Sequence, residues 1–214
     1  RYDLRLDDAG RVVDSLSGPL SVNGTARQTG DVWNVVAALA GPLDASANVN
    51  AQIAPSRIAI DLAAALPDLK PLVQQLSGGA QIAANAVQQD GVWDFNTEVK
   101  GPFDSTATAT GRFAEGLVNA DYTAFLPSLA AFAPGIPGSV SLNGDVQQRP
   151  DGWQFATEVA GPYASTVTTK GQFVDSALSA TYTVALPDVA ANGHYLAAIV
   201  LLQPRHDDRS IQST

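Results

Sequence analysis

A period of 60 residues runs through this chain and limits what it can fold into. Tryptophan recurs at this spacing, and so do two kinds of proline-containing pair: Trp33, Trp93, Trp153, Gly41-Pro42, Gly101-Pro102, Gly161-Pro162, Leu66-Pro67, Leu126-Pro127 and Leu186-Pro187. Three kinds of marker that share one period, with no insertion between them, indicate an internal repeat.

The markers divide the chain into three units with a fragment at each end. We expect the end of a preceding repeat at residues 1–17, repeats at 18–77, 78–137 and 138–192, and an irregular tail at 193–214. The first residues match the last strand of a unit, and the chain contains no methionine, even at position 1. We therefore expect it to be a piece of a longer protein.

Within each unit, apolar and polar residues alternate with a period of two. Trp93, Phe95 and Val99 stand at odd positions, and Asp94 and Glu98 stand between them. Successive side chains of a strand point to opposite faces of the sheet, so this alternation indicates strands with one apolar and one polar face. Each unit contains about four such stretches.

Short connections separate the predicted strands. Turn residues at Asp90-Gly91, Glu115-Gly116 and the Gly-Pro pairs leave room only for tight links, which join antiparallel neighbours. Leucines spaced by three and four after Leu66-Pro67 predict a short helical turn that crosses over to the next unit. The predicted fold class is all-β: an elongated, curled antiparallel sheet, shaped like a taco or groove, built from three 60-residue repeats of about four strands.

Composition excludes several classes of function. The chain has no cysteine, so disulfide scaffolds, thiolate zinc sites and thiol catalysis are impossible. Twelve basic residues against 21 acidic residues give a net charge of −9, which argues against binding nucleic acid through phosphate contacts. No apolar run approaches the roughly 20 residues that span a bilayer as a helix.

No pattern of an enzyme is present either. The sequence has no nucleophile elbow, phosphate-binding loop or metal-ligand spacing. The recurring Glu98 and Glu158 fit solvated strand positions, and His194 and His206 have no recurring partners. We therefore predict a protein that is not an enzyme and needs no cofactor and no metal.

The apolar face could be open or closed. It alternates large aromatic residues with Ala, Gly and Thr, which leaves volume that a packed core would fill, and this favours an open groove. The alternative is that the tryptophans are core markers that fix the register of a closed sheet. For an open groove, we expect the lining residues to be Trp33, Val35, Leu39, Trp93, Phe95, Val99, Phe113, Tyr122, Trp153, Phe155, Val159, Phe173 and Tyr182.

The order of the motifs resembles a known family. Residues 91–102 read G-x-W-x-F-x-T-x-V-x-G-P, residues 122–129 read Y-x-x-x-L-P-S-L, and residues 138–144 read G-x-x-x-L-x-G. This succession, over residues 1 to about 190, is similar to the repetitive β-rich region of the TamB proteins of Gram-negative bacteria. Related AsmA-like proteins use similar repeats.

The resemblance implies a long β-groove in the periplasm, within a protein anchored in the inner membrane. Members of the family are thought to carry phospholipid to the outer membrane and to assist outer-membrane protein assembly with an Omp85-class (TamA-like) partner. We expect the anchor and the docking region to lie outside these residues. The expected ligand is phospholipid, whose acyl chains gain about 0.8 kcal/mol for each CH₂ removed from water.

A structural or adhesive β-repeat, such as part of a secreted solenoid, is the competing hypothesis. Such a protein would also be acidic, free of cysteine and repetitive without gaps. A unit of 60 residues in four strands is long for one solenoid coil, which counts mildly against this alternative. Lipid that stays bound during purification would distinguish the two.

Overall fold

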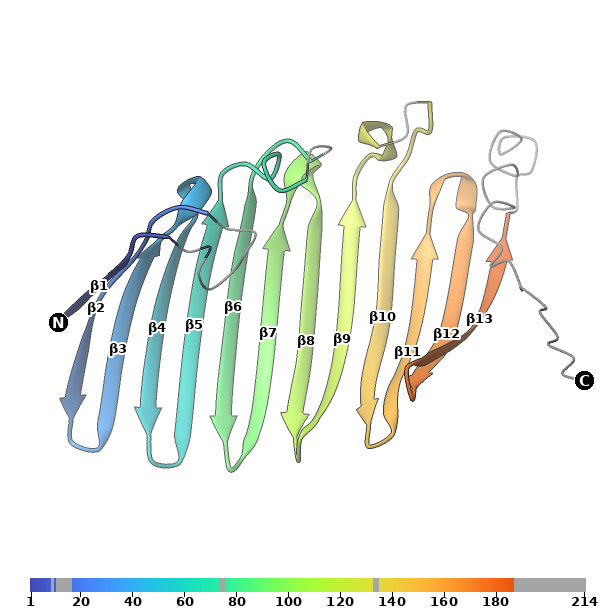
Figure 1. Ribbon diagram of the computed structural model, residues 1–214. Coiled ribbons are helices and arrows are strands. Elements are labelled where there is room, and N and C mark those ends of the chain that lie inside the picture. Colours follow the sequence, from blue (N-terminus) through green and yellow to red (C-terminus); the bar gives the residue numbers. More distant parts are fainter. Residues whose placement is uncertain (9, 11–16, 74–75, 133–134, 187–214) are drawn as a thin grey trace, which may run out of the picture.

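A computed structural model describes residues 1–8, 10, 17–73, 76–132 and 135–186, which contain thirteen strands (Figure 1). The strands are β1 (Tyr2–Leu6), β2 (Leu20–Thr29), β3 (Val32–Ala40), β4 (Ser46–Ala54), β5 (Arg57–Leu66), β6 (Ala80–Gln89), β7 (Val92–Lys100), β8 (Thr106–Ala114), β9 (Leu117–Leu126), β10 (Val140–Arg149), β11 (Gly152–Ala160), β12 (Thr166–Val174) and β13 (Ala177–Ala185). The predicted tail at 193–214 lies outside the described residues.

All thirteen strands belong to one antiparallel sheet, in which each strand pairs with its neighbours in the chain. The prediction of an all-β antiparallel fold is therefore confirmed. Two of the tight turns are Asp90-Gly91, with φ of 51° and 82°, and Glu115-Gly116, with φ of 54° and 79°. Positive φ at both central residues is the geometry of hairpin turns whose twist matches that of the strands.

The Gly-Pro pairs form a second kind of turn, at the opposite ends of the strands. Each pair leads into a short 3₁₀ turn: η2 (Pro42–Asp44), η3 (Pro102–Asp104) and η5 (Pro162–Ala164). In η3, Phe103 has a φ of 60° although it is not a glycine, and the N–H of Gly101 donates to the carbonyl of Ser105. The same conformation recurs in η2 and η5.

The segments after Leu66 and Leu126 connect strands that are adjacent in the sheet, so they do not cross over to a distant strand. The pair Leu186-Pro187 extends beyond the described residues. After Leu66, the N–H groups of Leu72 and Val73 both donate to the carbonyl of Leu69, which makes a single helical turn. The later segment contains η4 (Leu129–Ala131). The prediction of a short helical turn is confirmed, and the expected crossover was wrong.

An aspartate accepts backbone hydrogen bonds in the connection after β5 and in the connection after β1. Asp68 Oδ1 accepts the N–H of Lys70 at 3.0 Å and that of Gly78 at 3.2 Å. Asp8 Oδ1 accepts the N–H of Gly10 and of Gly18, both at 3.0 Å. These bonds lower the pKa of both carboxyls, chiefly through Lys70 for Asp68 and through Gly18 for Asp8.

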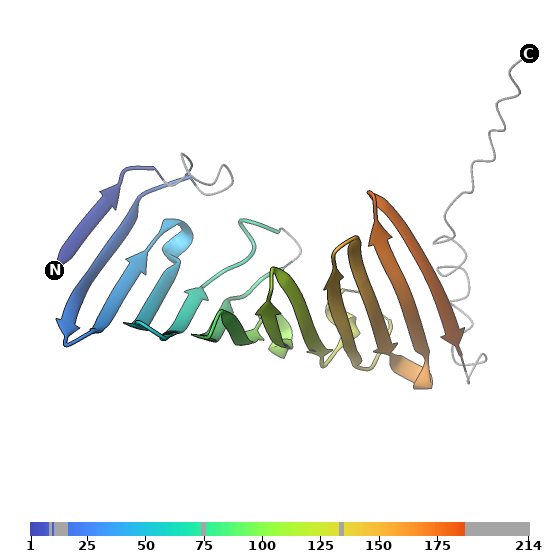
Figure 2. The same ribbon diagram turned by 90° about the horizontal axis from the view of Figure 1, so that it is seen from below.

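The sheet is gently bowed, and it is neither closed nor strongly curled (Figure 2). Twelve spacings of about 4.8 Å give it a width of about 58 Å. We predicted a curled, taco-shaped sheet, and in this respect the prediction was wrong. The physical reason is local: aromatic rings lie across glycines of the next strand, as described below, so large side chains find contacts without a second layer.

No two-layer core exists in the described part of the chain, because none of its large side chains is less than 2% exposed. Cohesion comes from the ladder of strand pairs and from side-chain contacts between neighbouring strands. Within the same residues, no helix has the length and apolar character to cross a membrane.

Candidate functional site: the apolar face of the sheet

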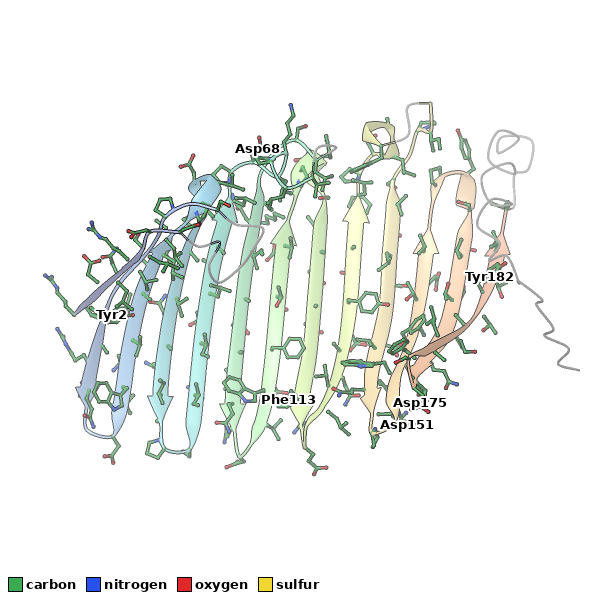
Figure 3. The ribbon with its side chains drawn as sticks, viewed as in Figure 1. Tyr2, Asp68, Phe113, Asp151, Asp175 and Tyr182 are labelled. Atoms are coloured by element: carbon green, nitrogen blue, oxygen red, sulfur yellow. The ribbon has the colours of Figure 1, made fainter. Side chains whose placement is uncertain are left out.

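The two faces of the sheet differ in chemistry, as the alternation predicted. We call the side on which Trp93, Phe95 and Val99 of β7 lie the apolar face, and the other side the polar face. In Figure 3 the aromatic rings of the apolar face lie in front of the ribbon, on the side toward which the ends of the sheet bend in Figure 2. The apolar face is therefore the inner side of the bow.

The register of the strands places all thirteen predicted lining residues on the apolar face. They fall into four rows that run across the sheet, perpendicular to the strands. From the Gly-Pro end to the hairpin end, we name the rows by their residue on β7, as the Val99, Thr97, Phe95 and Trp93 rows.

The Val99 row is apolar on every strand of the sheet. Each of its members is directly opposite the next one: Leu4, Val22, Leu39, Ala47, Ala64, Ile82, Val99, Ala107, Ala124, Leu142, Val159, Val167 and Val184. Aliphatic side chains thus form an unbroken stripe from one edge of the sheet to the other.

The Phe95 row is apolar on every strand from β2 to β13. Its members are Ala26, Val35, Ala51, Ile60, Ala86, Phe95, Gly111, Ala120, Val146, Phe155, Gly171 and Ala180. Between these two rows, the Thr97 row carries Tyr2, Tyr122 and Tyr182.

The tryptophans form the outermost row, next to the hairpin turns. Trp33, Trp93 and Trp153 each face a glutamine of the preceding strand: Gln28, Gln88 and Gln148 respectively. Trp33 is 43% exposed and Trp153 is 36% exposed, and Phe173 in the same row is 44% exposed. Side chains this exposed are not members of a sealed core, so the closed-sheet interpretation is not what the structure shows.

Glycines opposite aromatic residues allow the rings to lie flat. A Cβ on Gly111 would stand 2.4 Å from the Cζ of Phe95, and one on Gly171 would stand 2.5 Å from the Cζ of Phe155. Real Cβ atoms do not approach another atom so closely, so only glycine fits there. Each ring thus covers the backbone of the adjacent strand and continues the apolar surface across it.

Tyr122 and Tyr2 also lie over glycines, and their hydroxyl groups reach the strand beyond. Tyr122 lies over Gly144, and its hydroxyl is 2.5 Å from Oγ1 of Thr157, on the strand after that. Tyr2 lies over Gly24, and its hydroxyl donates to the carbonyl of Val36 at 3.3 Å. Each tyrosine therefore ties three consecutive strands together.

Reasoning from the sequence missed several members of the apolar face. On β5, Ile58, Ile60 and Leu62 face the same side as the predicted set. Their alternation with Ala59 and Asp61 was the signal that could have found them. Other apolar residues of this face that were not among the predicted lining residues include Leu4, Val22, Val49, Ile53, Ile82, Val118, Leu142, Val146, Val167, Leu178 and Val184.

The polar face carries the charged side chains of the strands. Glu98 lies 3.5 Å from Lys100, and both side chains are more than half exposed. A shallow hollow of about 280 Å³ over β4–β7 is lined by Asn48, Gln81 and Glu98, among others. Within the described residues, no three His, Asp or Glu side chains are grouped so that they could hold a metal ion.

Comparison of the chain with protein-family models, with curated proteins and with solved structures found no match.

Proposed function

We propose that the apolar face shields the acyl chains of phospholipids, and that this chain is a carrier segment without enzymatic activity. The observation that carries the proposal is the unbroken Val99 row, from Leu4 on β1 to Val184 on β13, on a face that no second layer covers among the described residues.

Continuity of the apolar surface is what a lipid carrier needs. An acyl chain loses about 0.8 kcal/mol for every CH₂ that returns to water, so a polar gap of a few carbons would be a barrier of several kcal/mol. The Val99 and Phe95 rows contain no polar side chain. The threonines of the row between them, such as Thr97 and Thr157, are short and keep apolar neighbours on both sides.

The dimensions of the sheet also suit acyl chains. Half of the roughly 30 Å hydrocarbon core of a bilayer is about 15 Å, the length of one acyl chain. The sheet, about 58 Å wide, could therefore hold several chains end to end along its rows. Alternate residues of a strand are about 6.8 Å apart, so the four rows together cover about 20 Å along the strands.

The negative net charge of the chain favours movement of lipid along the surface and disfavours tight capture of its headgroup. Phosphate headgroups would stay at the wet margin of the apolar face. The net charge of −9 provides no basic trap for an anionic headgroup, so a lipid would be retained by its acyl chains alone.

The resemblance to TamB proteins suggests where in the cell such a carrier would act. In that setting the chain is part of a periplasmic β-groove of three 60-residue repeats, within a protein anchored in the inner membrane. It would pass phospholipid toward the outer membrane and assist outer-membrane protein assembly together with an Omp85-class, TamA-like partner that docks on other regions.

A charge on the apolar face tests the proposal. Phe113 and Phe173 are partly exposed and lie on β8 and β12, so Phe113→Glu with Phe173→Glu should leave the strands intact. The matched control, Thr106→Glu with Gln172→Glu, places the same charges on the polar face of the same strands. We expect phospholipid, measured by mass spectrometry, to co-purify with the wild type and the control but not with the apolar-face variant.

Circular dichroism in the far ultraviolet should give the same β-sheet spectrum for all three proteins. Equal lipid loads on the two variants would overturn the proposal. A wild-type protein free of lipid, expressed in cells with two membranes, would favour the alternative of a structural or adhesive β-repeat. The strands of nine to ten residues from β2 to β13 and their gapless pairing would serve that alternative equally well.

A further inference from the structure

The apolar face is aliphatic toward the Gly-Pro end of the sheet. The Val99 row has no polar side chain on any of the thirteen strands. Beyond this row, the pairs Leu66–Ala80 and Leu126–Val140 continue the apolar surface to the ends of their strands. The end of an acyl chain has no polar group, so it would keep apolar neighbours here.

The same face becomes polar toward the hairpin end. The glutamines opposite the three tryptophans interrupt the Trp93 row. The turns beyond this row carry acidic residues: Asp31, Asp90, Glu115, Asp151 and Asp175. In Figure 3, Asp151 and Asp175 mark this end of the sheet, and Asp68 marks the opposite end. The apolar face therefore has a polar margin along its hairpin end.

The side chains at this margin have hydrogen-bond donors to offer. Among the described residues, nothing accepts a hydrogen bond from the indole N–H of Trp33, Trp93 or Trp153. The Nε2 of Gln28 donates to the carbonyl of Gly30 at 3.1 Å, which uses one of its two N–H bonds. Tryptophan is enriched where the apolar part of a membrane meets its polar surface, because the ring is apolar and the N–H needs an acceptor. The Trp93 row thus has the chemistry of a boundary between acyl chains and headgroups.

The distance between the two ends of the face matches one acyl chain. The four rows cover about 20 Å along the strands, and an acyl chain in a bilayer is about 15 Å long. The dimensions of the sheet allow acyl chains to lie along the rows or along the strands. Only along the strands would one end of each lipid meet polar side chains and the other end meet aliphatic ones.

We propose that each phospholipid lies along the strands, with its glycerol and phosphate at the Trp93 row and the ends of its acyl chains at the Val99 row. This inference rests on the proposed function and gives the tryptophans and glutamines of the Trp93 row a positioning role. Their indole and amide N–H groups donate to ester or phosphate oxygens. These donors are uncharged, so they orient the lipid while its acyl chains retain it.

The repeat places this positioning pair at regular intervals. A tryptophan with its glutamine recurs every 60 residues, on β2 and β3, on β6 and β7, and on β10 and β11. Four strands separate one pair from the next, which is about 19 Å across the sheet. A lipid that moves across the strands would therefore meet the same donors again and keep its orientation.

Fluorescence quenching tests the orientation, because the three tryptophans of the chain all lie in one row. The full chain is loaded with phosphatidylcholine that carries a nitroxide either on its headgroup or at the end of one acyl chain, and is then separated from free lipid. A phosphate assay measures the bound lipid. At equal loading, we expect the headgroup label to quench tryptophan fluorescence at least about twofold more strongly, since the two outer rows are about 20 Å apart.

A reporter at the opposite end of the same face is the matched control. Ile82 lies in the Val99 row and is 39% exposed, so it tolerates a larger group. The chain has no cysteine, so Ile82→Cys gives it a single thiol, which is labelled with a small fluorophore. We expect the order to reverse, with stronger quenching of this fluorophore by the chain-end label. The tryptophans stay in place, so both ends of the face are read in the same protein.

Substitution of the glutamines tests their positioning role. One variant replaces those of the Trp93 row: Gln28→Leu, Gln88→Leu and Gln148→Leu. The control replaces glutamines of the polar face: Gln52→Leu, Gln154→Leu and Gln172→Leu. We expect the first variant to bind as much phospholipid as the wild type but to lose part of the difference between the two labels, and the control to keep it. An unchanged difference in the first variant would overturn the role of the glutamines.

Failure of this inference differs from failure of the lipid proposal. Bound phospholipid whose two labels quench the tryptophans equally, or whose chain-end label quenches them more, would overturn the orientation and leave the carrier function standing. A protein that takes up no phospholipid would overturn the proposed function, and the orientation with it. Circular dichroism in the far ultraviolet should show the same strand content in every variant, and the wild-type comparison needs no variant at all.

Discussion

The ring of Tyr122 lies across Gly144, in the space that a Cβ on residue 144 would occupy. Such a Cβ would be 2.6 Å from the Oη of Tyr122, 2.7 Å from its Cζ and 2.4 Å from the carbonyl oxygen of Ala156. The tyrosine hydroxyl continues to Thr157 at 2.5 Å. Because Gly144 has no side chain, Tyr122 on β9 reaches across β10 to β11 and links the three strands.

Gly144→Ala should destabilise the sheet because the new methyl group displaces the ring. We expect the free energy of unfolding to fall by about 1–3 kcal/mol in urea titrations. Adding Tyr122→Leu should restore part of this loss, but not all, since the carbonyl of Ala156 still crowds the site. The control Ser141→Ala, on the polar face of the same strand, should change stability by less than about 0.5 kcal/mol.

Ala164→Gly should stabilise the protein, in contrast to Gly144→Ala. Ala164 has a φ of 55° in the turn after Gly161-Pro162, a region that costs an L-residue about 1–2 kcal/mol and costs glycine little. Glycine loses more conformational entropy than alanine on folding, and this offsets part of the relief. We therefore expect the free energy of unfolding to rise by up to about 1 kcal/mol. Ala160→Gly, at the last residue of β11, should lower stability. If both glycines destabilise the protein equally in thermal unfolding, the turn is not strained.

Phe103 and Phe132 should be energetically coupled. Their rings meet edge to face, with centroids 5.4 Å apart, so the turn η3 contacts the connection that follows β9. A double-mutant cycle with alanine at both positions should give a coupling of about 0.5–1.5 kcal/mol. The pair Phe103→Ala and Phe173→Ala serves as the control, because Phe173 lies on β12, four strands away from β8, and it should be additive.

Acid should loosen the connection that Asp68 secures. Its pKa is held below the ordinary 3.8 by the N–H groups of Lys70 and Gly78. A depressed pKa in the folded state contributes stability above the unfolded value, and this contribution is lost as the pH falls through the lowered folded value. Amide protection at Gly78, measured by hydrogen exchange, should therefore decline below about pH 4.

Two substitutions check the role of that carboxylate. Asp68→Ala should leave the amide of Gly78 unprotected at every pH. Asp68→Ser keeps an uncharged acceptor for the N–H of Lys70, as Ser128 does for the N–H of Ala130 at 3.3 Å, so the protection of the Lys70 amide should not change with acid. A carboxyl of Asp68 that titrates at or above 3.8 by NMR would contradict the bonding seen here.

Most of the candidate site could be read from alternation alone. Trp93, Phe95 and Val99 were placed on one face because side chains of a strand alternate, and this is a property of the local backbone. Ile58 and Ile60 alternate in the same way but were not predicted, because β5 has none of the recurring aromatic residues on which the prediction rested. The curl of the sheet was overestimated, since curvature depends on how side chains of adjacent strands pack.

The sequence by itself determined the strands, their two faces and their turns. Period-two alternation and Gly-Pro chemistry act over a few residues, so they could be recognised without a partner strand. Only the tertiary structure decided which residues meet across strands. Tyr122 and Gly144 are 22 positions apart, and the unbroken row from Leu4 to Val184 exists only in one register. A slip of one residue would turn every side chain of a strand to the other face.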